Sequence, residues 1–188
     1  HTEEGKIFLN NFLFKIANCS STWTAGKFIE EQIKLIRNQV KEDKVIVGVS
    51  GGVDSTVVAA LLHKAIGDQS TAILIDHGML RLNEAKNCIK ALKDGLDVNI
   101  NCYDESEIFL SKLENVTDPE KKRKIIGNQF IYSFDRIANE FGDIKYLSQG
   151  TLYPDIIESG VSKGKSAHVI KSHHNVGGLP DDMNFQLI

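Results

Sequence analysis

The strongest constraint on the fold is the stretch VIVGVSGGVDSTVVAALL, residues 45–62. An apolar run rich in β-branched residues leads directly into two adjacent glycines and then into a segment whose apolar residues have helical spacing. An uninterrupted apolar strand is typical of a parallel sheet covered on both faces, and parallel strands are usually connected through helices. The stretch therefore predicts a strand, a tight loop and a helix inside an α/β domain.

The same alternation continues along the chain. Thr24 is expected to cap the first helix, and Gly67 is expected to take a left-handed conformation after the second. The economical arrangement is a doubly wound, mainly parallel five-stranded sheet with helices on both faces. The patterns predict strands at residues 44–50, 71–76, 98–103, 145–150 and 185–188, helices at residues 24–43, 54–65, 83–93 and 119–141, and a long loop at residues 151–184.

Composition narrows the class of partner. The 188 residues are 41% hydrophobic and 25% charged, which suits one medium domain. A net charge of -3 does not supply the basic surface that nucleic-acid binding normally needs, and no apolar run is long enough to predict a membrane span. The three cysteines lack CxxC spacing, so the sequence predicts neither a disulfide framework nor a zinc site. We expect a small-molecule partner and a cytoplasmic, reducing location.

The loop SGGVDS, residues 50–55, carries the clearest chemical signal. Gly51 and Gly52 let backbone N–H groups approach an anion, and the following helix directs its unpaired N–H groups to the same place. Asp54 would repel a bare phosphate but fits a divalent cation that bridges it to one. The loop therefore predicts a metal-bound polyphosphate, with one open alternative, a tight turn in which Asp54 only caps the helix.

Two common nucleotide signatures do not follow the first strand. Neither G-x-G-x-x-G nor a Walker loop with its lysine is present there. SGGVDS instead resembles the pyrophosphate loop of the N-type ATP pyrophosphatases, which split ATP to AMP and pyrophosphate. Four further segments resemble the GMP synthetases of that family, in order and at fitting separations: IDHGMLRLNE, KIIGNQFIYSF, LSQGTLYPDIIES and IKSHHNVGGLP.

This resemblance implies an adenine nucleotide alpha hydrolase-like fold and a ligase that forms a C–N bond. XMP would be adenylated at its 2-oxygen with ATP as co-substrate and Mg²⁺ as cofactor, and ammonia would then displace AMP to give GMP. Two alternatives stay open. One is another N-type ATP pyrophosphatase such as NAD synthetase, and the other is a nucleotide-binding module without catalysis.

The resemblance also implies roles for individual residues. Asp54 would hold Mg²⁺, Arg81 would contact the XMP phosphate, and Gly150 would border adenine. Arg81 also has a simpler interpretation as a solvated surface arginine. The residues expected to cradle pyrophosphate are Ser50, Gly51, Gly52, Val53, Asp54 and Ser55.

Further catalytic candidates fall in the long loop. Asp155 and Glu158 are three residues apart, so one helical turn would place both on one face; by resemblance they help to form the adenylated intermediate, and otherwise they form a short acidic helix. Lys171, His173 and His174 form a cationic cluster expected to neutralise the ATP phosphates or to order the loop. A histidine metal site is the less favoured alternative.

The two ends suggest a larger protein. Residues 1–20 resemble the C-terminal tail of a class I glutamine amidotransferase domain, and Cys19 is expected to be a small buried side chain. Residues 21–188 resemble the ATP pyrophosphatase domain without the C-terminal domain through which the full enzyme forms a homodimer. Ammonia would come from glutamine through the amidotransferase domain. The chain alone is therefore expected to be inactive or to use only free ammonia.

Overall fold

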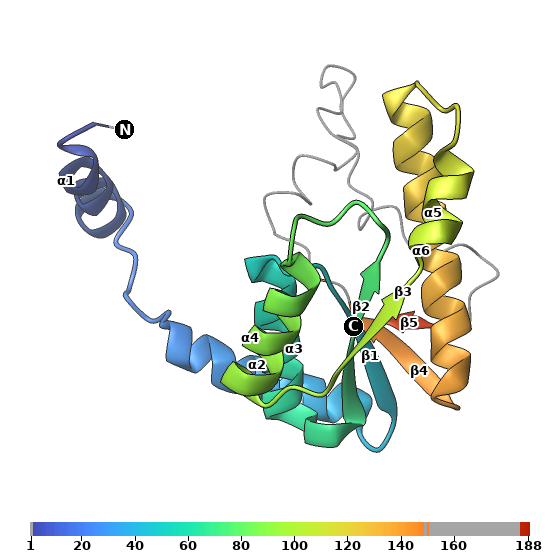
Figure 1. Cartoon of the computed structure of the whole chain (residues 1–188). Helices are drawn as coiled ribbons and strands as arrows, with labels where there is room; N and C mark the ends of the chain where they lie inside the picture. Colours follow the sequence, from blue (N-terminus) through green and yellow to red (C-terminus); the bar gives the residue numbers. More distant parts are fainter. Residues whose placement is uncertain (1, 149, 151–184) are drawn as a thin grey trace, which may run out of the picture. The chain divides into compact units, whose positions relative to one another are not determined.

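The computed structural model describes residues 2–148, 150 and 185–188. They contain one five-stranded sheet with the order β3-β2-β1-β4-β5, and every neighbouring pair is parallel (Figure 1). The prediction of a mainly parallel five-stranded sheet is therefore confirmed. The strands are β1 (Lys44–Val49), β2 (Ser70–Asp76), β3 (Ile100–Asp104), β4 (Ile144–Ser148) and β5 (Gln186–Leu187).

Helices cover both faces of the sheet, as the sequence predicts. The C-terminal half of α2, together with α3 and α4, packs over one face, and α5 and α6 pack over the other. A short 3-10 turn, Gly67–Gln69, joins α3 to β2. The helices are α2 (Ala25–Val40), α3 (Val53–Ile66), α4 (Glu84–Leu96), α5 (Ser106–Leu113) and α6 (Pro119–Glu140).

The central strand β1 supplies side chains to both halves of the core. Val45 and Val47 lie in the cluster beneath α3 and α4, while Ile46 lies in the cluster beneath α5 and α6. This division follows from the two-residue period of a strand. At Gly48 an added Cβ would lie 2.8 Å from Cζ of Phe134, so the missing side chain makes room for an α6 ring against β1.

Local signals set several element boundaries. The Thr24 hydroxyl accepts a hydrogen bond from the Lys27 N–H at 3.2 Å, which confirms the predicted cap of α2. Gly67 has φ 56° and ψ -129°, so it does not take the expected left-handed conformation, although its φ is positive as glycine allows. The sequence did not predict α5, an eight-residue helix whose first N–H is bound by the Asp104 carboxylate at 3.0 Å.

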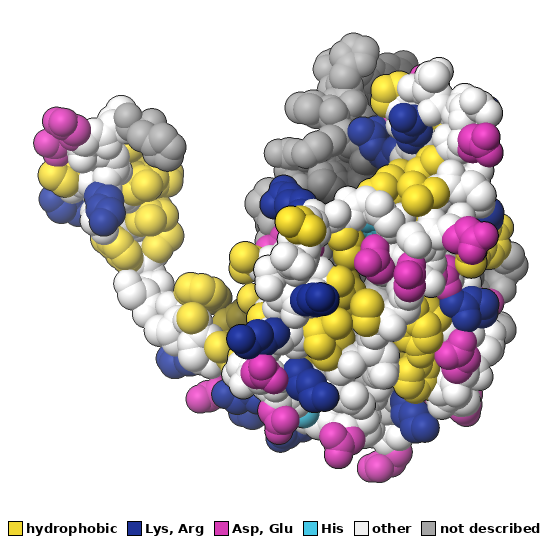
Figure 2. All heavy atoms as spheres, viewed as in Figure 1, with side chains coloured by type: hydrophobic (Ala, Val, Ile, Leu, Met, Phe, Trp, Pro, Cys, Tyr) yellow, Lys and Arg dark blue, Asp and Glu magenta, His cyan; other side chains and the backbone are white. Residues whose placement is uncertain are grey.

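The chain divides into two compact units, His1–Gln32 and Ile33–Ile188. The first unit contains α1 (Gly5–Asn10) and a π-helical turn η1 (Asn11–Ile16). Its surface carries several apolar side chains (Figure 2), and Phe8 is 75% exposed. Cys19 is exposed, so the expectation of a buried thiol was wrong, because the residue follows the last helical turn.

The division into residues 1–20 and 21–188 stays a prediction. None of the helices in the described part of the chain is long and apolar enough to cross a membrane.

Candidate functional site

The glycine loop lies at the carboxyl end of the central strand. β1 pairs with β2 on one side and with β4 on the other, and the chain reaches those two neighbours over opposite faces of the sheet. The carboxyl ends of such strands, where the winding direction changes, are where doubly wound folds bind ligands. Residues 50–52 therefore stand at the position that the topology itself favours for a ligand.

The backbone of the loop requires glycine at one position. Gly51 has φ 77°, a conformation that residues with a side chain rarely adopt. A Cβ there would also lie 3.6 Å from Cβ of Cys88 and 3.7 Å from Cγ of Glu84, so the loop rests against α4. Gly52 is the N-cap of α3 and makes no side-chain cap, which leaves the first N–H groups of α3 directed out of the helix.

Hydroxyl groups hold the loop in shape. The Ser50 N–H donates to Oγ of Ser55 at 3.1 Å, and the two serine Oγ atoms lie 3.3 Å apart. The Thr56 hydroxyl donates to the Gly52 carbonyl at 2.8 Å. Ser55 is buried, and its hydroxyl bonds within the loop.

Asp54 differs from these hydroxyl residues. Its carboxylate is exposed and has no hydrogen bond or ion pair with the described residues, and it does not cap α3. The alternative in which Asp54 serves only as a helix cap is therefore not what this structure has. An exposed carboxylate beside the N-terminus of a helix can bind a cation while the helix binds the anion.

Gly150 approaches the same loop from the next strand. A Cβ on Gly150 would lie 3.1 Å from N of Ser55 and 3.2 Å from the carbonyl carbon of Asp54. Both contacts are to backbone, which cannot move aside without shifting α3. The structure therefore brings the end of β4 against the start of α3.

Arg81, in the segment that leads into α4, lines the same hollow as Gly51 of the glycine loop. Its N–H donates to Oε2 of Glu84 at 2.7 Å, and the Glu84 N–H donates back to the Arg81 carbonyl at 3.0 Å, which fixes the start of α4. Arg81 shares a hollow of about 410 Å³ with the loop. The hollow is lined by Gly51, Thr56, Arg81, Leu82, Glu84, Asn87, Cys88 and Ala91.

The sequence reasoning did not select the α4 residues of this hollow. Glu84, Asn87, Cys88 and Ala91 recur at intervals of three and four, which marks one face of a helix, but only the fold tells which face meets the glycine loop. Cys88 is buried, and burial raises the pKa of its thiol above the ordinary value. Among the site residues predicted from the sequence, Asp155, Glu158, Lys171, His173 and His174 lie outside the described residues.

Comparison with known proteins decides the family. The family model described as NAD synthase matches residues 27–129, which include the glycine loop, the hollow and the start of α6. The chain belongs to the NAD synthase family. Among solved structures, the chain is similar in fold to the NH3-dependent NAD synthetase from Campylobacter jejuni, with a TM-score of 0.60 and 19% identity over 74% of this chain and 62% of that one. This likeness confirms the fold.

The curated relatives of this chain are named differently from the family model. GMP synthases [glutamine-hydrolyzing] from Staphylococcus epidermidis and Symbiobacterium thermophilum are 54% and 53% identical to this chain over all 188 residues. The resemblance to GMP synthetases is therefore confirmed. The chain spans 36% of the length of these relatives.

Proposed function

We propose that this chain is the ATP pyrophosphatase region of a glutamine-hydrolysing GMP synthetase. ATP would adenylate the 2-oxygen of XMP, and ammonia would then displace AMP to give GMP. The observation that carries the proposal is the glycine loop at the carboxyl end of β1, with Asp54 exposed beside it and Arg81 in the adjoining hollow. The relatives that match the whole chain carry the name of this reaction.

The loop suits pyrophosphate as the leaving group. Gly51 and Gly52 leave the backbone open to close approach, and the N–H groups at the start of α3 present a partial positive charge. Ser50 and Ser55 brace each other, so the donors are in place before the ligand arrives. Preorganised donors of this kind stabilise the charge that develops on a leaving group.

Asp54 fits a magnesium ion bound together with phosphate. Mg²⁺ in proteins usually takes one or two carboxylates, with phosphates and water completing its shell, and Asp54 offers one exposed carboxylate at the loop. When bound, the ion would neutralise charge on the transferring phosphates. Asp54 would hold the ion, and the loop amides would orient the pyrophosphate.

The remaining roles follow the resemblance. Arg81 would contact the phosphate of XMP, and Gly150, which lies against the start of α3, would border adenine. Asp155 and Glu158 would assist adenylation. Lys171, His173 and His174 would neutralise phosphate charge and help to exclude water from the adenylated intermediate.

In the whole protein we infer two further parts. An amidotransferase domain, of which residues 1–20 would be the tail, would supply ammonia from glutamine, and a C-terminal domain would form a cytoplasmic homodimer. Without them, residues 21–188 would bind ATP but make little or no GMP.

The decisive assay measures pyrophosphate release by the full-length protein supplied with ATP, Mg²⁺ and an ammonium salt. GMP synthetase activity predicts release that depends on XMP and yields GMP and AMP in equal amounts. Pyrophosphate release that does not depend on XMP would instead favour another ATP pyrophosphatase. Because the NAD synthase family model matches the chain, an NAD synthetase is the second candidate. ATP binding without turnover under any of these conditions would favour a non-catalytic module.

A further inference from the structure

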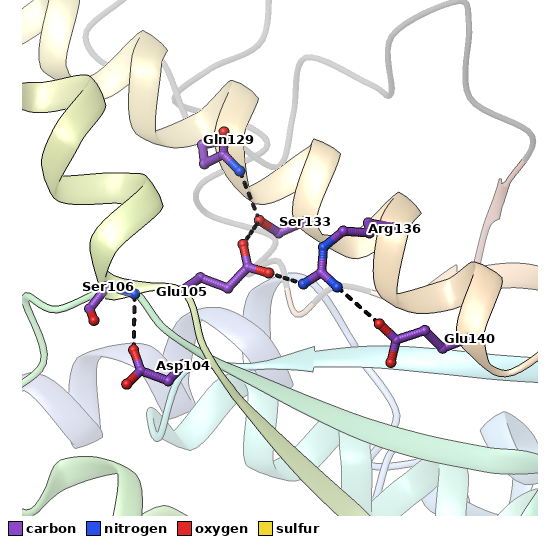
Figure 3. A network of polar contacts seen from close by, with 7 residues as sticks. All are labelled: Asp104, Glu105, Ser106, Gln129, Ser133, Arg136 and Glu140. Atoms are coloured by element: carbon purple, nitrogen blue, oxygen red, sulfur yellow. Dashed lines mark hydrogen bonds and ion pairs between the residues drawn. The ribbon is translucent and has the colours of Figure 1, made fainter.

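A buried carboxylate lies behind the loop that carries Arg81. Glu105 stands between β3 and α5 and is only 3% exposed. Its carboxylate accepts a hydrogen bond from the Ser133 hydroxyl and pairs with the guanidinium of Arg136, both on α6 (Figure 3). The pairing raises the pKa of Arg136.

The network extends along α6 in both directions. Gln129 donates to the Ser133 hydroxyl at 3.0 Å and accepts a hydrogen bond from Lys112 of α5. At the other end Arg136 pairs with Glu140 at 2.9 Å. Glu105 therefore sits at the centre of a chain of contacts that fixes α5 against α6 (Figure 3).

The Glu105 carboxylate is buried while the Arg136 side chain is about half exposed, so the cost of removing the carboxylate from water offsets much of the attraction within the pair. A well-packed apolar residue would serve stability as well. What the ion pair adds is a defined geometry, since both carboxylate oxygens have a partner in a fixed direction.

That geometry reaches the β2–α4 loop through three contacts. The Glu105 N–H donates to the Asp76 carbonyl at 2.8 Å, where β2 ends. Gly78 lies so close to α5 that an added Cβ would be 2.9 Å from Cβ of Ser106. The His77 ring packs against Phe109 of α5, with ring centres 5.9 Å apart.

The loop itself is held mainly by local hydrogen bonds. The Gly78 N–H donates to the Asp76 carboxylate at 2.9 Å, and the Met79 N–H donates to Nδ1 of His77 at 3.1 Å. Both of these bonds are exposed.

The contacts to α5, together with the packing of the His77 ring on Phe130 of α6 at 5.5 Å between ring centres, therefore set where this turn begins. The turn leads to Arg81, whose N–H and carbonyl bond to Glu84 at the edge of the hollow.

We propose that Glu105 is a positioning residue for Arg81. Its carboxylate, paired with Ser133 and Arg136, sets α5 on α6, and α5 sets residues 77–81 at the carboxyl edge of the sheet. Because the expected effect on substrate binding depends on the role of Arg81, that part of the inference rests on the proposed function. The expected effect on the β2–α4 loop does not rest on the proposed function.

The test compares Glu105→Gln with Glu140→Gln in the full-length protein. Glutamine at 105 keeps the size of the side chain but removes the charge that pairs with Arg136, whereas Glu140→Gln removes only the outer, half-exposed pair of the same arginine. Ser133→Ala, which deletes a single hydrogen bond to Glu105, is a milder second variant should Glu105→Gln fail to fold. Arg136→Lys keeps a positive charge opposite Glu105, so its effect should be smaller than that of Glu105→Gln.

The first measurement is amide hydrogen exchange. Glu105→Gln should speed exchange in peptides covering residues 77–82 by about tenfold and leave β1 peptides unchanged, while Glu140→Gln should change neither. Unchanged exchange at residues 77–82, or equal acceleration throughout the protein, would overturn the positioning role.

The second measurement is steady-state kinetics. Misplacing a binding group costs affinity for the ligand it contacts, so Glu105→Gln should raise the KM for XMP about tenfold and leave the KM for ATP near its wild-type value. A fall in kcat with both KM values unchanged would indicate a merely structural residue and contradict the inference. If the wild-type protein has no XMP-dependent turnover, the proposed function fails, and hydrogen exchange alone decides the role of Glu105.

Discussion

Asp54 is the residue on which the proposed chemistry depends most directly. The serines beside it are engaged in the loop and Gly52 is the N-cap, so among the described residues the Asp54 carboxylate interacts locally only with the dipole of α3, as a first-turn acid. A carboxylate at a phosphate-binding loop is unfavourable unless a cation lies between the two negative groups. The loop geometry and the acid are thus explained together by one ligand, a magnesium pyrophosphate.

Replacing Asp54 by Asn tests this role. The change should lower kcat for XMP-dependent pyrophosphate release by at least about 10²-fold, because a preorganised electrostatic contact to the leaving group is lost. The thermal midpoint should fall only slightly, because the exposed carboxylate has no partner among the described residues and loses only its interaction with the dipole of α3, worth up to about 1 kcal/mol. Wild-type kcat in a correctly folded Asp54→Asn protein would remove Asp54 from the mechanism.

Cys88 reports on the same loop from the α4 side. Burial is the main cause of its raised pKa, so at a given pH it holds less of the reactive thiolate than an ordinary cysteine. Iodoacetamide should therefore label the exposed Cys19 well before Cys88. The rate of alkylation at Cys88 should still rise with pH at values where the alkylation rate of an exposed small-molecule thiol no longer changes, because the raised pKa delays formation of the Cys88 thiolate.

Mass spectrometry of peptides labelled between pH 7 and pH 10 would measure both rates, with Cys88→Ser as the control for assignment. Labelling of Cys88 as fast as Cys19 at pH 7 would contradict the burial of Cys88 beside Gly51.

At the scale of elements, the strands and long helices are predictable from the sequence because each has a strong periodic signal. β1 is apolar at nearly every position, and α6 begins with Asp118 and Pro119, whose carboxylate and ring favour a helix start. The position of the glycine loop can also be predicted from the sequence, since the loop directly follows the buried strand β1. These signals are local, so no tertiary knowledge is needed to read them.

Tertiary packing decides what the sequence leaves open. α5 spans eight residues, too short for a clear periodic signal, and its position depends on Glu105, which looks like a surface acid in the sequence but is buried. The face of α4 that meets Gly51 likewise depends on how α4 packs. The hollow beside the loop was therefore not predictable as a set of residues, although Arg81 was selected by resemblance.

The contact between β1 and α6 gives a prediction at this scale. Gly48→Ala should lower the free energy of unfolding by about 1–3 kcal/mol, because the new methyl group would lie 2.8 Å from the ring of Phe134. Gly95→Ala in α4 is the matched control, since its Cβ would meet no atom within 4 Å, and it should stabilise the protein by up to about 1 kcal/mol.

Urea denaturation would measure both changes. Adding Phe134→Leu to Gly48→Ala should restore part of the loss, because the shorter side chain relieves the overlap. A Gly48→Ala protein as stable as wild type would show that Phe134 does not pack on β1 as described.

At the scale of the whole molecule, the sheet domain has its own core. The described core clusters contain no residue before Ile36, and the exposed apolar residues of α1 and η1 belong to the first unit. Removing residues 1–20 should therefore shift the thermal midpoint by less than about 2 °C, which corresponds to a change of a few tenths of a kcal/mol in the free energy of unfolding. Scanning calorimetry would check this, and loss of the cooperative transition would show that residues 1–20 are part of the folded domain.

The central claim is that backbone amides of the glycine loop, with a cation held by Asp54, bind pyrophosphate. Titration of magnesium pyrophosphate into the ¹⁵N-labelled protein, followed by amide NMR, tests it most directly. We predict that the largest shifts fall on the N–H groups of Gly51, Gly52 and the first turn of α3, and that Asp54→Asn weakens them. Saturable binding with the largest shifts elsewhere, and none at Gly51 or Gly52, would contradict the account.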